Sequence, residues 1–228
     1  MSSPRHVIFD LDGTLVDSIP GIAWSVDAAL RSCGLAPAER DLAPLIGPPV
    51  RDILAAVAGV TEPDLLDRLE RGFRSSYDSA GWRLTVCQPG VREMLSQLLA
   101  VGVELWLVTN KPALSTAMIL FELHLDGFFR EVVSRDSRAP VFAAKSEMLI
   151  DLLERHAIGR EACLMAGDTM EDWRAAEAAG IPCVLVPHGY GSGAVPPGCR
   201  RIGGWRELLE MCACTSAPAP PAQTEVNA

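Results

Sequence analysis

Short apolar runs alternate with amphipathic helical patterns along most of the chain, and this alternation limits the fold more than any other sequence feature. Each run is bounded by turn-forming residues, which is typical of a buried strand. The runs span residues 6–10, 103–109, 131–134, 162–166 and 182–186, and the helical patterns span residues 91–99, 114–123, 146–156 and 170–179. Strands that alternate with helices are joined by right-handed crossovers into a parallel sheet. The sequence therefore predicts an α/β fold.

Residues 18–81 break this alternation. They show only helical periodicity, with apolar side chains at positions such as Ile22, Val26 and Leu30. The stretch stands between the first strand and a turn at residues 88–90, so we expect a helical domain inserted into the α/β domain near one edge.

The expected division is therefore an α/β core of residues 1–17 and 82–214 with a helical cap of residues 18–81. Residues 215–228 contain several prolines and alanines and no aromatic residue. Such a segment cannot offset the entropy lost on ordering, so we expect a disordered tail.

The charge balance excludes several classes of partner. The 228-residue chain has 29 acidic and 20 basic residues, a formal net charge of −9, which disfavours nucleic acid and anionic membrane surfaces. No apolar run reaches about 18 residues, and the N-terminus lacks a signal-peptide core. The seven cysteines lack a secreted spacing and fit free thiols. We therefore expect a cytoplasmic protein that binds small ligands or other proteins; the oligomeric state stays open.

Two carboxylates stand at the carboxyl end of the first predicted strand. Asp10 and Asp12 are two residues apart, and the period of a strand points both side chains to the same face. Ligands of an open parallel sheet bind beyond the carboxyl ends of its strands. A divalent cation is the usual remedy for carboxylates held this close. The alternative is a solvated acidic turn, because Asp-Gly is common in turns.

A second acidic pair follows the fourth predicted strand. Asp168 lies at the strand end, and Asp172 lies four residues on, in the first turn of the next helix. Helix capping by Asp168 or Thr169 explains one of these carboxylates. Convergence of both acids with Asp10 and Asp12 favours a site for a hard cation.

Thr109, Asn110 and Lys145 could bind an anion. Thr109 and Asn110 end the strand after the helical insertion, where a hydroxyl, an amide and free N–H groups suit phosphate, although both are also ordinary capping residues. Lys145 opens a predicted helix, where its charge opposes the macrodipole at a cost of about 0.3–1 kcal/mol. A lysine placed against the dipole suggests an anionic partner, while an exposed lysine that covers apolar surface is the alternative.

These groups of residues resemble, in their order, the four signature motifs of the haloacid dehalogenase superfamily of phosphohydrolases. The resemblance runs from residue 6 to about residue 190. It rests on the Asp-Leu-Asp-Gly-Thr run from Asp10, on Thr109-Asn110, on Lys145, and on the run from Gly167 to Asp172. Within the superfamily, the helical insertion, the Asn110-Lys111-Pro112 run and a Gly47-Pro48 loop resemble the phosphoglycolate phosphatase-like branch.

The resemblance implies a Rossmann-like parallel sheet of five strands with an inserted helical cap, and a Mg²⁺-dependent phosphatase for a small phosphate ester. Asp10 would attack phosphorus to form an aspartyl-phosphate, and Asp12 would protonate the leaving alcohol and then activate water. The implied metal ligands are Asp10, the Asp12 backbone carbonyl, Asp168 and Asp172. The implied phosphate and substrate contacts are Thr109, Asn110, Lys145 and the cap loop at Gly47.

Two alternatives stay open. A phosphosugar mutase of the β-phosphoglucomutase type would share every core residue, and a catalytically idle interaction protein would be expected to lose one of the acids. Arg51 and Arg74 of the cap could meet a substrate carboxylate or could be solvated helix residues. Asp12 argues against a dehalogenase, because dehalogenases of this superfamily lack the second acid of the first motif. A phosphonatase would carry a Schiff-base lysine in its cap, and residues 18–81 contain no lysine.

Overall fold

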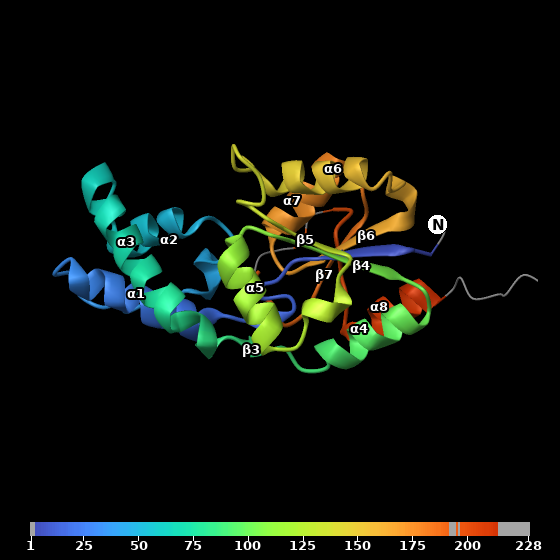
Figure 1. Ribbon diagram of the computed structural model, residues 1–228, viewed down its shortest axis with the longest axis horizontal. Helices are drawn as coiled ribbons and strands as arrows, with labels where there is room; N and C mark the ends of the chain where they lie inside the picture. The colour runs from blue at the N-terminus through green and yellow to red at the C-terminus, as the bar shows by residue number, and fades with distance from the viewer. Residues whose placement is uncertain (1–2, 192–194, 196, 214–228) are drawn as a thin grey trace, which may run out of the picture.

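The computed structural model describes residues 3–191, 195 and 197–213, and its centre is a sheet of six parallel strands (Figure 1). The sheet order is β5-β4-β1-β6-β7-β8, and every neighbouring pair runs parallel. The strands are β1 (His6–Phe9), β4 (Glu104–Thr109), β5 (Glu131–Ser134), β6 (Cys163–Gly167), β7 (Cys183–Leu185) and β8 (Arg200–Arg201). The predicted α/β fold with a parallel sheet is thus confirmed.

The expected count of five strands was wrong. The sixth strand, β8, pairs Arg200 and Arg201 with Val184 and Leu185 of β7. Two arginines at a sheet edge form no apolar run, so the sequence pattern could not indicate them. This segment is a strand because it pairs with the backbone of β7.

Helices cover both faces of the sheet, because successive side chains of each strand point to opposite faces. Val7 and Phe9 of β1 pack in the core that includes α4 (Val91–Ala100), α5 (Ala113–Glu122) and α8 (Trp205–Ala213). Ile8, between them, packs in the core that includes α6 (Lys145–Arg155) and α7 (Met170–Ala179). Figure 1 shows α6 and α7 on one side of the sheet and α4 and α8 on the other.

The register of the central strands brings their carboxyl ends to one edge. Phe9 at the end of β1 pairs with Leu107 of β4 and with Ala166 of β6. The residues that follow these three strands therefore meet at that edge, as a ligand site of an open parallel sheet requires.

Three helices form a separate group beside the sheet (Figure 1). They are α1 (Ile19–Ser32), α2 (Val50–Ala58) and α3 (Pro63–Ser79), and Val26, Leu54 and Leu69 are fully buried within the core that they help to form. The chain leaves the α/β part through β2 (Val16–Asp17) and returns through β3 (Val86–Cys87), which pair antiparallel. The short helices of the chain are η1 (Ala43–Leu45), η2 (Gly81–Leu84), η3 (Asp126–Phe128) and η4 (Arg160–Ala162).

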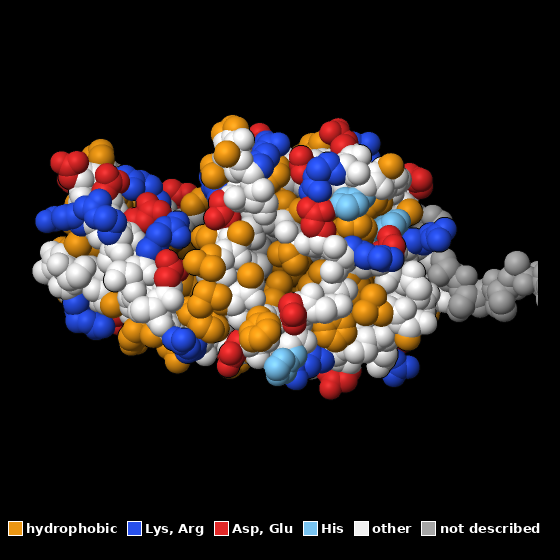
Figure 2. All heavy atoms as spheres, in the orientation of Figure 1, with side chains coloured by type: hydrophobic (Ala, Val, Ile, Leu, Met, Phe, Trp, Pro, Cys, Tyr) orange, Lys and Arg blue, Asp and Glu red, His pale blue; other side chains and the backbone are white. Residues whose placement is uncertain are grey.

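Apolar side chains also lie on the surface. Leu114 and Phe121 of α5 are about 70% exposed, and Figure 2 shows hydrophobic side chains gathered over this part of the molecule. Within the described ranges, no helix combines the length and the apolar character needed to cross a membrane. The tail expected at residues 215–228 lies outside the described residues, as does residue 214 of the expected core.

Candidate active site

Three carboxylates meet at the carboxyl edge of the sheet. Asp10 follows β1, Asp168 follows β6, and Asp172 lies in the first turn of α7. Each offers an oxygen that lies within 4.8 Å of the others, and all three side chains are buried. The predicted convergence of these acids is therefore present in the structure.

Glycines allow the close approach on which this acid group depends. A Cβ atom on Gly13 would lie 2.3 Å from Oδ2 of Asp168, and one on Gly189 would lie 2.0 Å from the Asp168 Cβ. A Cβ atom on Gly167 would lie 2.4 Å from the Asp172 Cβ. Real Cβ atoms do not approach so closely, so any larger residue at these positions would displace the acids.

Asp172 also caps its own helix. Its Oδ2 accepts hydrogen bonds from the backbone N–H of Asp168 at 3.1 Å and of Thr169 at 3.0 Å. The Thr169 hydroxyl donates to the same oxygen at 2.9 Å. Thr169 is the N-cap residue of α7, and Asp172 occupies the N3 position of a capping box. Helix capping, the alternative explanation of this motif, therefore holds for Thr169. Oδ1 of Asp172 stays available to other groups of the site.

Lys145 lies among the acids. It begins α6, it is 5% exposed, and its Nζ lies 2.5 Å from Oδ1 of Asp10 and 2.5 Å from Oδ1 of Asp172. Burial alone would lower the pKa of this amine, but the two carboxylates raise it above its usual value. The expected anionic partner of Lys145 is thus a pair of protein carboxylates.

One ammonium does not balance three buried carboxylates. Burial raises the pKa of Asp10 well above its usual range, although Lys145 opposes this. Burial and the Asp172 charge raise the pKa of Asp168 to about 7. Burial acts in the same sense on Asp172, but the charge and hydrogen bond of Lys145 outweigh it and lower its pKa. Buried carboxylate oxygens that lack positive charge suit a hard divalent cation such as Mg²⁺.

Asp12 does not join the acid group through its carboxylate. Its two oxygens accept hydrogen bonds from Lys111 Nζ at 2.9 and 3.0 Å. Lys111 is buried, and its Nζ also lies 4.9 Å from the centre of the Tyr77 ring in α3. Lys111 was not among the predicted site residues. The available signals were its place directly after Asn110 and the presence of only two lysines in the chain.

Thr109 and Asn110 lie at the end of β4, and both line a cavity above Asp10. Thr109 is buried, and its hydroxyl oxygen accepts the backbone N–H of Lys111 at 3.1 Å. The Asn110 amide donates to the Gly47 carbonyl at 3.0 Å and to Oε1 of Glu171 at 2.7 Å. Asn110 therefore joins the loop at Gly47, between η1 and α2, to the first turn of α7.

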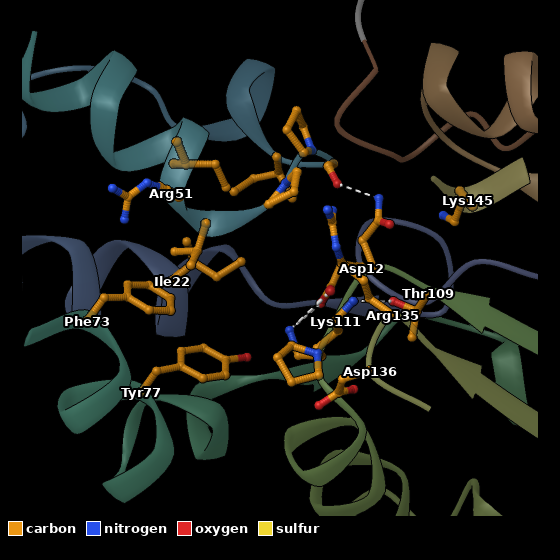
Figure 3. A pocket seen from close by; sticks show the side chains of 18 of the residues that line it. Asp12, Ile22, Arg51, Phe73, Tyr77, Thr109, Lys111, Arg135, Asp136 and Lys145 are labelled. Atoms are coloured by element: carbon orange, nitrogen blue, oxygen red, sulfur yellow. Dashed lines mark hydrogen bonds and ion pairs between the residues drawn. The ribbon is translucent and has the colours of Figure 1, made fainter. Parts of the chain in front are cut away.

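The cavity has a volume of about 460 Å³ and lies between helices α1–α3 and the carboxyl edge of the sheet (Figure 3). Asp10, Asp12 and Lys145 line its sheet side, together with Thr109 and Asn110. Gly47 lines the opposite side, with a φ of 129° that favours glycine.

Arg51 and Arg74 line the cavity too, but both are already paired within the helical group. Arg51 donates to Asp67 at 2.6 Å and to Glu70 at 3.3 Å, and Arg74 donates to Glu70 at 3.2 Å. The two arginines face the cavity, as a contact with a substrate carboxylate would require, but they already have protein carboxylates as partners. Neither this interpretation nor that of solvated helix residues therefore describes them fully.

Other residues that hold Asp168 gave little signal in the sequence. The Tyr190 N–H donates to Oδ2 of Asp168 at 2.7 Å, and the Thr14 hydroxyl donates to Oδ1 at 3.1 Å. The Tyr190 hydroxyl in turn donates to Asp17 at 3.0 Å. Thr14 belongs to the first motif, whereas Tyr190 lies beyond β7 in a segment with no distinctive pattern.

Comparisons with known proteins agree with this geometry. The phosphoglycolate phosphatase of Pseudomonas putida is 34% identical over 197 residues, which cover 83% of this chain and 72% of that protein. The tyrosine-protein kinase PtkA of Mycobacterium bovis is also 34% identical, over 190 residues that cover 83% of this chain and 64% of that protein. Because these two relatives have different named activities and the same percentage identity to this chain, percentage identity alone does not identify the substrate.

A solved structure and a family profile also match this chain. A predicted phosphoglycolate phosphatase from Haemophilus somnus superimposes with a TM-score of 0.81 at 26% identity, over 92% of this chain and 99% of that one. The profile of the haloacid dehalogenase-like hydrolases matches residues 7–186. The resemblance stated from the four motifs is thereby confirmed. This chain belongs to the haloacid dehalogenase-like hydrolase family.

Proposed function

We propose that this protein is a Mg²⁺-dependent phosphatase that hydrolyses a small phosphate monoester, in the manner of the phosphoglycolate phosphatases that it resembles. The observation that carries the proposal is the buried cluster of Asp10, Asp168 and Asp172 with Lys145 at one side of the cavity. A solvated acidic turn would not bury three carboxylates, and a purely structural cluster would not open onto a ligand-sized space.

Asp10 is the proposed nucleophile. Of the three acids, it alone lines the cavity, so its carboxylate can reach a phosphorus atom there. A bond forms between an Asp10 oxygen and phosphorus while the bond from phosphorus to the alcohol oxygen breaks. Water then attacks the aspartyl-phosphate at phosphorus, which releases inorganic phosphate and restores the Asp10 carboxylate.

Asp12 is the proposed general acid and base. In the first step it gives a proton to the leaving alcohol oxygen, and in the second it takes a proton from the attacking water. The two hydrogen bonds from Lys111 fix the position of its carboxylate at the cavity wall. Lys111 is thus a proposed positioning residue.

Asp10, Asp168, Asp172 and the backbone carbonyl of Asp12 would hold Mg²⁺. When bound, the ion supplies positive charge that neutralises phosphoryl oxygens near the carboxylates. Lys145, Thr109 and the backbone N–H of Asn110 would contact the remaining phosphoryl oxygens. Gly47, on the opposite wall, would approach the substrate from the helical side.

The helices of residues 18–81 would act as a cap that excludes water and selects the substrate, on a core of residues 1–17 and 82–214. We further propose a cytoplasmic place for the protein and no nucleic-acid or membrane partner. The charge of −9 supports the exclusion of nucleic acid.

The test is phosphate release from a panel of small phosphate esters, with Mg²⁺ and with excess EDTA. We expect release only with Mg²⁺, and its loss in Asp10→Asn without loss of folding. Asp151→Asn, which changes a carboxylate on the outer side of α6, serves as the control and should keep the wild-type rate. Turnover that persists in EDTA or in Asp10→Asn would refute the proposal, and isomerisation without phosphate release would favour a mutase.

A further inference from the structure

The charges that line the cavity are almost all paired. Lys145 contacts Asp10 and Asp172, and Lys111 contacts Asp12. The two arginines of the helical group share Glu70. Arg135 is the remaining cation of the lining, and no described acidic group lies within 4.0 Å of its guanidinium.

Arg135 is held at the cavity by the sheet. It directly follows β5, the strand next to β4, so it begins its loop at the same carboxyl edge as Thr109. Its backbone carbonyl accepts the N–H of the buried Phe142 at 3.0 Å, which fastens the loop that it begins. Figure 3 shows the side chain in the cavity beside Asp12 and Lys111.

The acid next to Arg135 is engaged elsewhere. Asp136 also lines the cavity, but its Oδ1 accepts the backbone N–H of Ala113 at 2.7 Å, at the start of α5. A half-buried guanidinium without a carboxylate partner is costly to desolvate further unless a ligand supplies the anion. Its planar donors match carboxylate or phosphate oxygens in pairs.

The opposite wall of the cavity has an apolar part beside the paired charges of Arg51, Glu70 and Arg74. It contains Ile22, Ile53 and Phe73 together with the ring of Tyr77. In Figure 3, Ile22, Phe73 and Tyr77 come from the helical group and face the space that Arg135 enters from the sheet side. A volume of about 460 Å³ lies within the range of about 300–1,000 Å³ that is usual for larger organic ligands, and exceeds what a two-carbon acid fills.

We propose that Arg135 is a specificity-determining residue that binds an anionic group on the leaving alcohol, and that this alcohol carries an apolar body of about the size of an aromatic ring. The inference rests on the proposed phosphatase function and names its substrate class. The phosphoryl group would meet Asp10, the apolar body would pack on Phe73 and Tyr77, and the second anion would meet Arg135.

The experiment compares esters that differ in one feature each. Phenyl phosphate is neutral beyond its phosphoryl group, and carboxyphenyl phosphate and phenylene bisphosphate add the two kinds of anion. Hydroxyethyl phosphate and phosphoglycolate repeat the comparison without the ring. For the wild type we expect kcat/KM to be about 10- to 100-fold higher for an anionic aryl ester than for phenyl phosphate, mainly through KM.

Variants assign this preference to residues. Arg135→Gln should lower kcat/KM for the anionic aryl esters far more than for phenyl phosphate and so bring the preference close to unity, and Arg135→Lys should restore part of it. Arg138→Gln is the matched control, because Arg138 lies in the same loop but packs on Phe142 and pairs with Glu147. Phe73→Leu, with its fold checked by thermal melting, should lower kcat/KM for aryl esters more than for the small ones.

The outcomes separate this inference from the function on which it rests. Release of phosphate from phenyl phosphate, with an anion preference that Arg135→Gln leaves intact, would overturn the role of Arg135. A wild-type enzyme that prefers phosphoglycolate to every aryl ester would overturn the apolar body. No release from any ester would instead refute the phosphatase function itself.

Discussion

Replacement of Lys145 by methionine tests how the acid group is stabilised, because two electrostatic effects predict opposite results. The ammonium opposes the dipole of α6, and its removal should relieve about 0.3–1 kcal/mol. The same ammonium lies 2.5 Å from Asp10 and from Asp172, and all three side chains are buried. Removal of one partner of a buried ion pair costs about 3–5 kcal/mol.

The larger effect should decide the result. We expect Lys145→Met to lower the free energy of unfolding by about 2–4 kcal/mol in EDTA, as the difference between these two effects. The dipole argument alone, which is all that the sequence offers, predicts unchanged or slightly higher stability. Methionine keeps most of the side-chain volume, so a cavity contributes little to the loss. Bound Mg²⁺ should reduce the loss, because it supplies positive charge to the same carboxylates.

Urea unfolding followed by far-UV circular dichroism measures this effect in EDTA and in saturating Mg²⁺. Arg138→Met is the control, because Arg138 is about half exposed and each of its ion pairs, with Glu147 and with Asp151, should contribute at most about 1 kcal/mol. We also expect the rate of phosphate release by Lys145→Met to fall by about 10²–10³. A variant as stable as the wild type in EDTA would show that Lys145 does not compensate ionised Asp10 and Asp172.

Further predictions concern the metal, pH and the partner of Asp12. Mg²⁺ at about 100 times its dissociation constant should stabilise the protein by about 2.7 kcal/mol, seen as a rise in melting temperature that Asp168→Asn abolishes. In EDTA, the free energy of unfolding should fall as pH rises from about 4 to about 7. The reason is that folded Asp168, whose pKa is raised to about 7, holds a proton that the unfolded chain releases. A melting temperature in EDTA that rises over this pH range would contradict the reasoning. Lys111→Met should lower kcat by about 10–10² through misplacement of Asp12, and should have no further effect in an Asp12→Asn background.

The acids of the site could be predicted because their positions follow from strand ends. Parallel strands end at a common edge, so the acids at the carboxyl ends of the first and fourth predicted strands should approach one another, and Asp172 follows Asp168 by one helical turn. The same reasoning found Thr109 and Asn110. It needed only local periodicity and the parallel topology, which are the features that a single sequence expresses most directly.

The contacts of Lys111 and Arg135 could not be predicted, because they depend on how separate parts of the chain pack. Lys111 meets the Tyr77 ring of α3, and Arg135 faces a wall of the same helical group. No periodicity relates these positions. The strand β8 was missed for a similar reason, since its two arginines become a strand only through pairing with β7.

The position of Lys145 illustrates why local reasoning can identify a residue and still misjudge its energetics. Its place at the start of a helix marked it as unusual, and that observation was correct. The helix dipole, however, is a weaker influence than two carboxylates in a buried site. Asp172 is subject to the same comparison, because capping explains its Oδ2 while its Oδ1 contacts Lys145.

Asn110 connects the two halves of the proposed mechanism. Its side chain holds the Gly47 carbonyl and the Glu171 carboxylate, and Glu171 precedes Asp172 in the first turn of α7. The loop that bounds the cavity on the helical side is therefore joined, through one amide, to the turn that carries an acid of the proposed metal site. Substrate selection and phosphoryl chemistry would then share a rigid contact, since a shift of the Gly47 loop must either break these hydrogen bonds or move Glu171. If the leaving-group contacts come from the helices and from Arg135, as proposed, Asn110 would keep them in register with the reacting groups at the strand ends.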